Sequence, residues 1–200
     1  MPRHLFGAIS AAGSLGNNMN KQKALDRIAK EIENCRICKK DSIGKPVIGE
    51  GNPDTEIVFI GEAPGKKEAE TGRPFIGRSG KFLRTHIRAL GLDDQKDVYI
   101  TSPVKYLPKR GTPDKNQIAH GMIHLRKQLD IINPKIIVLM GSVAALGVLG
   151  EFVPVAKQHG KTVGKAGQIY FISYHPAAAI RFHKLRQVFD KDFKKLKNLL

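Results

Sequence analysis

Apolar residues in this chain gather into four short runs that have the length and composition of buried β-strands. The runs lie at residues 57–60, 98–101, 136–140 and 169–172, and β-branched and aromatic residues dominate them. Each run ends in glycine, serine or proline, as strands do where they enter a loop. The pattern therefore predicts a strand at each of the four positions.

Segments with helical spacing of apolar residues alternate with these runs. They lie at residues 21–34, 80–90, about 113–132, 142–149 and 185–200. Strands that alternate with helices form parallel sheets covered on both faces. We therefore predict an α/β fold, namely a three-layer α/β/α sandwich with a central four-stranded parallel sheet. A single domain is expected at 19–200, after a flexible N-terminal tail at 1–18.

The loop after the first run has the composition of a ligand-binding loop. Its sequence is GEAPG, at residues 61–65. Open α/β sheets bind ligands at the carboxyl ends of their strands. Gly61 and Gly65 allow the backbone to approach a ligand closely, and Pro64 stiffens the turn. The loop is thus a candidate binding site.

Charge narrows the choice of partner. The chain holds 34 lysines and arginines against 18 acidic residues, which gives a formal net charge of +16. Such an excess favours a polyanionic partner, with nucleic acid the first choice. No uninterrupted apolar stretch approaches the roughly 18 residues of a membrane span, so we expect no membrane partner.

The two cysteines, Cys35 and Cys38, form a single C-x-x-C pair. This spacing suits half of a metal site or a redox pair. It does not suggest the disulfide framework of a secreted protein, so a cytoplasmic location is expected.

Three separated motifs stand out along the chain, namely GEAPG at 61–65, TGRPFIG at 71–77 and YHPAA at 174–178, and the C-x-x-C pair precedes them. Together they resemble the family-4 uracil-DNA glycosylases of the uracil-DNA glycosylase superfamily. The resemblance extends over roughly residues 32–196 in the same order. It implies a monofunctional enzyme that flips uracil out of DNA and hydrolyses its N-glycosidic bond, which initiates base excision repair. It also implies that catalysis needs no cofactor, that the DNA is single- or double-stranded, and that the protein is a monomer.

The resemblance assigns catalysis to His175 and Glu62. A neutral imidazole N–H of His175 would donate to uracil O2 and stabilise charge as the bond breaks. Glu62 begins the loop whose backbone would hold the pyrimidine edge and position water. Phe75 would be the platform on which the base stacks, and Glu68 would crowd the uracil 5-position and help to exclude thymine. The substrate-binding residues implied in this way are Gly61, Ala63, Gly65, Glu68, Phe75 and Ser102.

The resemblance also implies a segment that presses into the minor groove of DNA. Residues 177–184 follow the YHP motif, and Ile180 or Arg181 is the candidate wedge that fills the space of the flipped base. Lys184 would contact a phosphate. Together with the basic loop after the second run, the predicted DNA-binding residues are Lys105, Arg110, Ile180, Arg181 and Lys184.

The chain departs from the family at a base-reading position. Ser102 stands where the family has asparagine. Asparagine offers a donor and an acceptor on one planar group, whereas serine offers a single rotatable hydroxyl. Uracil recognition is therefore expected to be weaker, broadened or lost. Two alternatives follow: a glycosylase for hypoxanthine or xanthine, and a non-catalytic DNA-binding module on a glycosylase fold.

A second departure removes half of the family's four-cysteine iron–sulfur site. The third cysteine position falls on Tyr106, and the fourth falls near His120 or Gly121. A [4Fe–4S] cluster normally takes four thiolates, so an intact cluster is not expected. Cys35 and Cys38 with His120 or His124 offer the alternative of a structural zinc site. A bare thiol pair or a degenerate cluster is also open.

Overall fold

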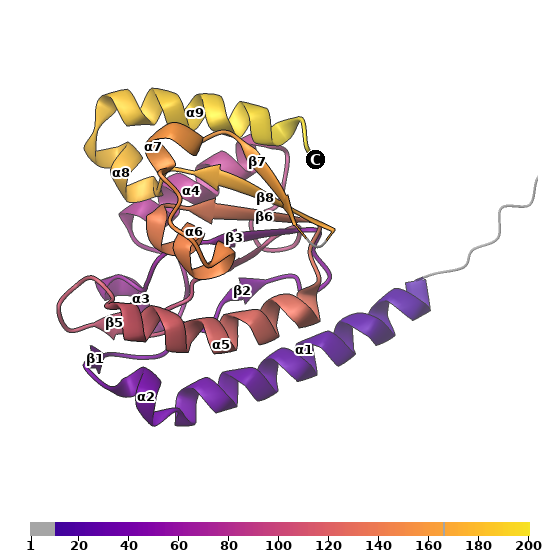
Figure 1. The fold of residues 1–200 in the computed structure, drawn as a ribbon. Coiled ribbons are helices and arrows are strands. Elements are labelled where there is room, and N and C mark those ends of the chain that lie inside the picture. Colours follow the sequence, from indigo (N-terminus) through magenta and orange to yellow (C-terminus); the bar gives the residue numbers. More distant parts are fainter. Residues whose placement is uncertain (1–10, 166) are drawn as a thin grey trace, which may run out of the picture.

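The computed structural model describes residues 11–165 and 167–200, and Figure 1 shows their fold. The helices are α1 (Ala11–Asn34), α2 (Arg36–Lys39), α3 (Lys66–Thr71), α4 (Arg78–Ala89), α5 (Lys115–Ile132), α6 (Ser142–Leu149), α7 (Val155–Gln158), α8 (Pro176–Arg181) and α9 (His183–Lys197). The strands are β1 (Ser42–Ile43), β2 (Glu50–Gly51), β3 (Ile57–Ile60), β4 (Tyr99–Thr101), β5 (Leu107–Pro108), β6 (Ile136–Met140), β7 (Thr162–Lys165) and β8 (Gln168–Ser173).

The central sheet has the strand order β2-β4-β3-β6-β8-β7. Its four inner strands are parallel, which confirms the four-stranded parallel core that the apolar runs predict. The sheet is wider than expected, because β2 and β7 pair antiparallel at its two edges. Neither edge strand has an apolar signature, since β2 has two residues and every side chain of β7 is exposed. A small separate sheet joins β1 to β5.

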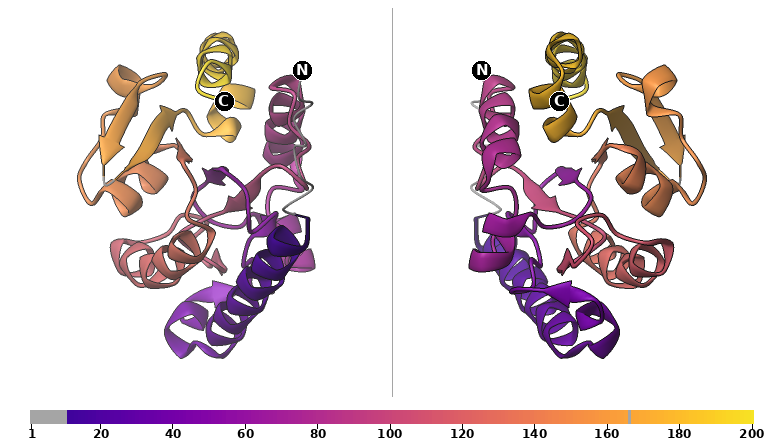
Figure 2. Two further views of the ribbon diagram at one scale, coloured as in Figure 1. Left: turned by 90° about the vertical axis from the view of Figure 1, so that its right-hand side faces the viewer. Right: turned by 90° about the vertical axis from the view of Figure 1, so that its left-hand side faces the viewer.

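Side chains alternate across the sheet and build a core on each face. Val58 and Ile60 of β3 face a core that includes residues of α5 and α6, whereas Ile57 and Phe59 face one that includes residues of α4 and α9. This is the period-two alternation of a strand buried on both sides. The three layers are visible in Figures 1 and 2, where α1 lies outside α5. The α/β/α sandwich is thus confirmed.

Two helix boundaries follow directly from the sequence. The helix α6 spans the predicted 142–149, and α5 starts after Asp114, whose side chain forms a capping box with Gln117. The helix α1 begins at Ala11, ten residues before the expected start, so it includes residues 11–18 of the predicted tail. The rest of that predicted tail, residues 1–10, lies outside the described residues.

Within residues 11–165 and 167–200, no helix combines the length and apolar character that a membrane crossing requires.

Candidate functional site

The candidate site lies where the four parallel strands end. Gly61 follows β3, Ser102 follows β4, Gly141 follows β6, and His175 comes two residues after β8. In Figure 1 these strands point to the left, toward α8, and the right-hand view of Figure 2 looks onto this edge. The chain adds β4 on one side of β3 and β6 on the other, so β3 marks a switch in strand order. Such a switch point is where open α/β sheets bind ligands.

Gly61, Phe75 and His175 surround one space at this edge. A Cβ on Gly61 would lie 2.5 Å from the Phe75 ring and 3.7 Å from Nε2 of His175. The ring centroids of Phe75 and His175 are 6.0 Å apart. Gly141, with φ of +94°, leaves room beside the His175 backbone, because a Cβ there would come within 3.2 Å of His175 Cβ. The structure therefore brings together the residues that the three motifs predict for one site.

The local structure fixes both the charge and the tautomer of His175. Its Nδ1 caps α8 by accepting a hydrogen bond from the Ala177 backbone N–H at 3.2 Å. Burial lowers the His175 pKa to about 4. The imidazole is therefore neutral near pH 7, and its one proton sits on Nε2, because Nδ1 is an acceptor. The Nε2–H group is the one that lies nearest to Gly61.

The Phe75 backbone adopts a conformation that is unusual for a residue with a side chain. Its φ is +51°, in the left-handed region. Arg84 holds this conformation by donating to the Phe75 carbonyl from Nε and to the Pro74 carbonyl from Nη2, both at 3.1 Å. Gly80 of α4 packs directly on the Phe75 carbonyl group, where a Cβ would overlap it. Strained backbone that its surroundings fix in this way concentrates at functional sites.

Glu68 joins the two loops of the site. Its Oε1 accepts hydrogen bonds from the backbone N–H groups of Ile76, at 2.9 Å, and Gly77, at 2.7 Å. Its Oε2 lies where a Cβ on Gly65 would be 2.7 Å away. The buried carboxylate thus ties the segment after Phe75 to the start of α3. Sequence reasoning placed Glu68 at the site but did not find this bridging role.

Arg84 is a site residue that sequence reasoning missed. It lies on the buried face of α4 and pairs with Asp94 at 2.9 Å and with Glu50 at 3.3 Å. The helical spacing of apolar residues predicts that this face of α4 is buried. An arginine on a buried face needs a charged partner, and this was the one signal in the sequence that could have identified Arg84. Burying a guanidinium is costly unless it is paired and fully hydrogen-bonded. The Arg84 guanidinium meets both conditions, because each of its three nitrogens donates a hydrogen bond.

We predict that Arg84→Met lowers the free energy of unfolding by about 3 kcal/mol, because it leaves buried partners without their cation. Denaturant unfolding measures this loss. Arg88→Met is the matched control, since Arg88 binds the same Asp94 carboxylate with a side chain that is 62% exposed. Equal losses in the two variants would contradict the role of Arg84 as a buried anchor.

Glu62 and Ala63 begin the loop after β3. The Glu62 side chain is half-buried, and burial raises its pKa above the usual range for glutamate. Within the part of the chain that the structure describes, no hydrogen bond or ion pair joins its carboxylate to another residue. Ala63 packs against the core under α5 and α6, and Gly65 precedes α3 as its N-terminal cap. The Glu62 carboxylate is therefore available to a ligand or a water molecule.

Ser102 is buried at the end of β4, with 5% of its surface exposed. Its hydroxyl donates to the Val104 carbonyl at 2.9 Å. The hydroxyl proton of Ser102 is thus donated within its own loop, whereas the hydroxyl oxygen can still accept a hydrogen bond. A serine here cannot offer the free donor that an asparagine would.

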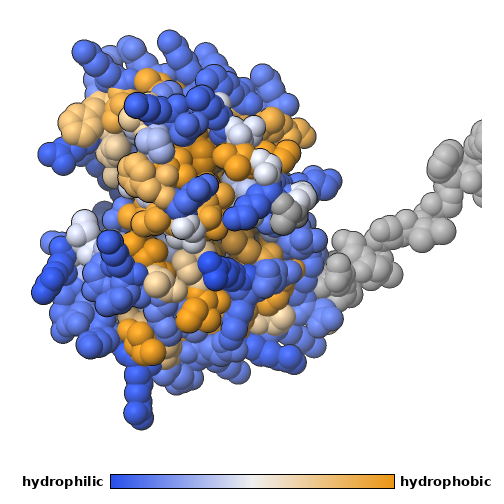
Figure 3. All heavy atoms as spheres, in the orientation of Figure 1, coloured by the Kyte–Doolittle hydropathy of each residue, from blue (hydrophilic) through white to orange (hydrophobic). Residues whose placement is uncertain are grey.

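Beside the site lies a groove of about 620 Å³ between α3, α4 and α8. Its basic lining residues are Lys66, Lys67, Arg78 and Arg181, and Ile180 also faces it. In Figure 3 the molecule is hollowed at this left-hand edge, and hydrophilic side chains border the hollow. Lys66, Lys67 and Arg78 were not predicted, although each lies within a few residues of a motif. The groove has the charge and position to guide a polyanion to the strand ends.

Of the predicted DNA-binding residues, Arg110, Arg181 and Lys184 are exposed and Ile180 is half-buried. The β5 strand that precedes Arg110 lies on the same side of the molecule as α8 in Figure 1. These positions are open to a large ligand.

The prediction for Lys105 is wrong. Its side chain is buried, with 1% exposed. Its Nζ donates to Thr101 Oγ1 at 2.8 Å, to Gln128 Oε1 at 2.6 Å and to the Ile48 carbonyl at 3.1 Å. Burial lowers the Lys105 pKa to about 7. Lys105 therefore braces the end of β4 from inside and cannot contact a phosphate.

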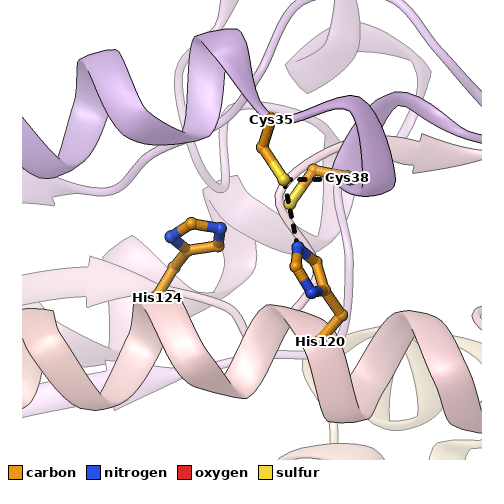
Figure 4. A group of neighbouring side chains, drawn as sticks. All are labelled: Cys35, Cys38, His120 and His124. Carbon is orange, nitrogen blue, oxygen red and sulfur yellow. Dashed lines mark hydrogen bonds between the residues drawn. The ribbon is translucent and has the colours of Figure 1, made fainter.

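The two cysteines and two of the histidines meet beside the loop that follows β4. Figure 4 shows Cys35 and Cys38, at the α1–α2 junction, facing His120 and His124 of α5. One donor atom from each of the four lies within 4.8 Å of all the others. The two thiols are free rather than joined in a disulfide. The four side chains thus form a group that is able to hold a metal ion, as the sequence spacing permits.

Comparisons with known proteins agree with this geometry. The profile of the Uracil DNA glycosylase superfamily matches residues 48–197. The type-4 uracil-DNA glycosylase of Sulfurisphaera tokodaii is 39% identical, over 88% of this chain and 84% of the relative. The corresponding enzyme of Archaeoglobus fulgidus is 36% identical, over 88% and 94%, and that of Thermotoga maritima is 34% identical, over 90% and 96%. With its three motifs gathered at one edge of the sheet, the chain belongs to the uracil-DNA glycosylase superfamily.

Proposed function

We propose that this protein is a monofunctional uracil-DNA glycosylase that initiates base excision repair. The observation that carries the proposal is the neutral His175 whose Nε2–H group shares one space with Phe75 and Gly61. A base flipped out of DNA meets there an aromatic ring, a backbone without side chain and a hydrogen-bond donor. These are the groups that binding and release of a pyrimidine require.

The flipped base stacks on the Phe75 ring. Gly61 supports this arrangement because a side chain at that position would overlap the ring and fill the space beside it. The backbone of residues 62–65 borders the pyrimidine edge. Glu68 acts through this frame, since its carboxylate holds the backbone that follows Phe75. We therefore assign Glu68 a positioning role in the discrimination against thymine.

The reaction breaks the bond between uracil N1 and the sugar C1′. The electron pair of that bond passes to the base, and the negative charge spreads to O2, where the His175 Nε2–H donates a hydrogen bond. A water molecule adds to C1′ on the opposite side, and the Glu62 carboxylate orients this water and accepts its proton. The departing uracil anion takes up a proton from solvent and Glu62 returns its proton to solvent, so the products are free uracil and an abasic site. His175 and Glu62 perform these steps without a cofactor.

The groove beside the site binds the DNA backbone. Lys66, Lys67 and Arg78 contact phosphates, and Lys184 and Arg110 extend the contact beyond the groove. Ile180 or Arg181 occupies the space that the flipped base leaves. Phe182 follows them with half of its surface exposed, and the Arg181 guanidinium stacks on its ring. An exposed aromatic residue at this position is suited to pack against a base step.

We predict that replacing Lys66, Lys67 and Arg78 together by glutamine weakens DNA binding and makes its salt dependence shallower, by roughly 0.9 per lost phosphate contact. Binding isotherms at several salt concentrations measure this slope. A second triple variant, with glutamine at Lys191, Lys194 and Lys197, removes the same charge from the C-terminal half of α9 and should change the slope little. Equal effects of the two variants would show that net charge, and not the groove, binds DNA.

The activity itself is tested by base release from oligonucleotides that carry uracil opposite guanine, uracil opposite adenine, or uracil in a single strand. Duplexes with hypoxanthine and xanthine belong in the same panel, because the Ser102 hydroxyl is committed to Val104. Ser102→Asn is compared with the unmodified protein. Uracil release by the unmodified protein supports the proposal. Release of hypoxanthine or xanthine alone, or tight binding without release of any base, would overturn it in favour of another base or a non-catalytic module.

A further inference from the structure

We propose that Cys35, Cys38, His120 and His124 bind a single zinc ion that ties the α1–α2 junction to α5. The inference is independent of the glycosylase activity, because the cluster lies apart from the strand-end site. It rests on the identity of the four donors, their spacing, and the burial of His124.

The donor atoms lie near the separations that one zinc ion requires. In a tetrahedral zinc site the bond lengths of about 2.3 Å to sulfur and 2.0–2.1 Å to nitrogen place neighbouring donors roughly 3.3–3.8 Å apart. Here all four donors lie within 4.8 Å of one another, and Cys35 Sγ lies 3.1 Å from His120 Nε2. The four donors are therefore grouped closely enough to share one ion.

His124 provides an independent sign of a metal site. Its side chain is buried, with 6% exposed, and neither ring nitrogen has a hydrogen-bond partner among the described residues. Figure 4 shows the ring between α5 and the cysteine segment. Buried polar groups normally have a partner, and an unpartnered one calls for an explanation such as a bound ion. Coordination would give one of the two nitrogens its partner.

The donor set does not fit the four-thiolate iron–sulfur cluster that the family resemblance implies. Only Cys35 and Cys38 supply thiols, and Tyr106, at the position of the third cysteine, packs against Ile28 and Ile32 of α1. A cluster needs four thiolates, whereas two thiolates and two imidazoles are a common structural set for zinc.

The geometry favours a single ion over a two-iron cluster with two cysteines and two histidines. In such a cluster the cysteines bind one iron and the histidines bind the other. Here a cysteine and a histidine, Cys35 and His120, are in direct contact at 3.1 Å. That short separation suits two ligands of the same ion.

The position of the cluster gives the ion a structural role. The space around Cys38 and His120 is also lined by Val104 and Lys105, in the loop that follows β4. Gly121 of α5 packs on the Pro103 carbonyl, where a Cβ would overlap it. An ion at this place fixes α1, α2 and α5 against the loop that carries Ser102, and so supports the site without taking part in the reaction.

The test begins with metal analysis of the full-length protein after dialysis against metal-free buffer. We expect about one zinc ion per chain. Cobalt(II) in its place should give the intense visible absorption of a tetrahedral site with sulfur ligands. Chelation should lower the Tm, and zinc, but not magnesium, should restore it.

Variants assign the ligands. Cys38→Ser and His124→Leu should lose most of the zinc, whereas His124→Cys should keep it, because zinc accepts a thiolate in that place. His86→Gln is the control, since His86 pairs with Asp190 on the other face of the sheet. If the first two variants fail to fold, the cobalt spectrum of the unmodified protein and the zinc content of His124→Cys decide. Iron with broad visible absorption, a folded protein without bound metal, or loss of zinc from His124→Cys would each overturn the proposal.

Discussion

His175→Asn should lower kcat for uracil release about 10²–10³-fold, with little change in the Kd for uracil-containing DNA. The asparagine side chain still offers an oxygen to cap α8, in the place of the Nδ1 that accepts from Ala177. Its amide nitrogen stops one bond short of Nε2, so the donor to uracil O2 is lost. Single-turnover base release gives the rate, and equilibrium binding gives the Kd.

Two further variants separate this role from a structural one. His175→Leu loses both the donor and the cap, so it should match His175→Asn in rate and fall below it in stability by about 1 kcal/mol. His86→Gln keeps a hydrogen-bond donor to Asp190 and should leave kcat unchanged. A His175→Asn enzyme with nearly full kcat would show that Nε2–H does not stabilise the leaving base.

Phe75→Ala should lower kcat/KM for uracil release by about 5–150-fold, the equivalent of the ~1–3 kcal/mol that base stacking on an aromatic ring contributes. Phe75→Tyr keeps the ring face and should keep most of the activity. Steady-state kinetics on a uracil-containing single strand measure the effect, because no duplex has to open there.

The unusual backbone of Phe75 allows loss of the ring to be distinguished from loss of strain. Phe75→Gly removes the ring and introduces a residue that adopts a φ of +51° without strain. Alanine at this position still carries the energetic cost of the left-handed conformation. The two variants should be equally impaired in kcat/KM, with the glycine variant more stable by roughly 1 kcal/mol. If Phe75→Gly retained full activity, the stacking role would be wrong.

Much of the fold could be predicted because it depends on local pattern. The inner strands are continuous apolar runs, since both faces of the sheet are covered, and α6 and the start of α5 have clear boundaries. The edge strands β2 and β7 could not be predicted, because short or exposed strands carry no apolar signature. The start of α1 could not be predicted either, because the sequence before residue 19 has no helical periodicity.

The site residues likewise fall into those that the sequence predicts and those that it does not. His175, Phe75 and Gly61 lie in motifs, and the parallel sheet brings the motifs together. Lys105 and Arg84 depend on tertiary partners that no local pattern reveals. A lysine in a basic loop looks exposed until Gln128 and Thr101 are seen to surround it, and an arginine on an apolar helix face gives no clue to Asp94.

The grouping of Cys35, Cys38, His120 and His124 was only partly predictable. The spacing of His120 and His124 places them one helical turn apart on α5. Their meeting with Cys35 and Cys38 depends on the packing of α1 against α5, which the sequence does not specify. Burial of both nitrogens of His124 without a partner is a purely structural observation.

The pH dependence of single-turnover uracil release tests the central claim most directly. Burial holds the His175 pKa near 4, below its ordinary 6.5, so the imidazole is already neutral well below pH 6.5. We predict that the protein releases uracil and that its rate shows no inflection near pH 6.5. An acid limb between the His175 pKa near 4 and pH 6.5 should come from Glu62, whose pKa burial raises, and should vanish from the residual rate of Glu62→Gln. Absence of uracil release, or an inflection near pH 6.5 that disappears in His175→Asn, would contradict the account.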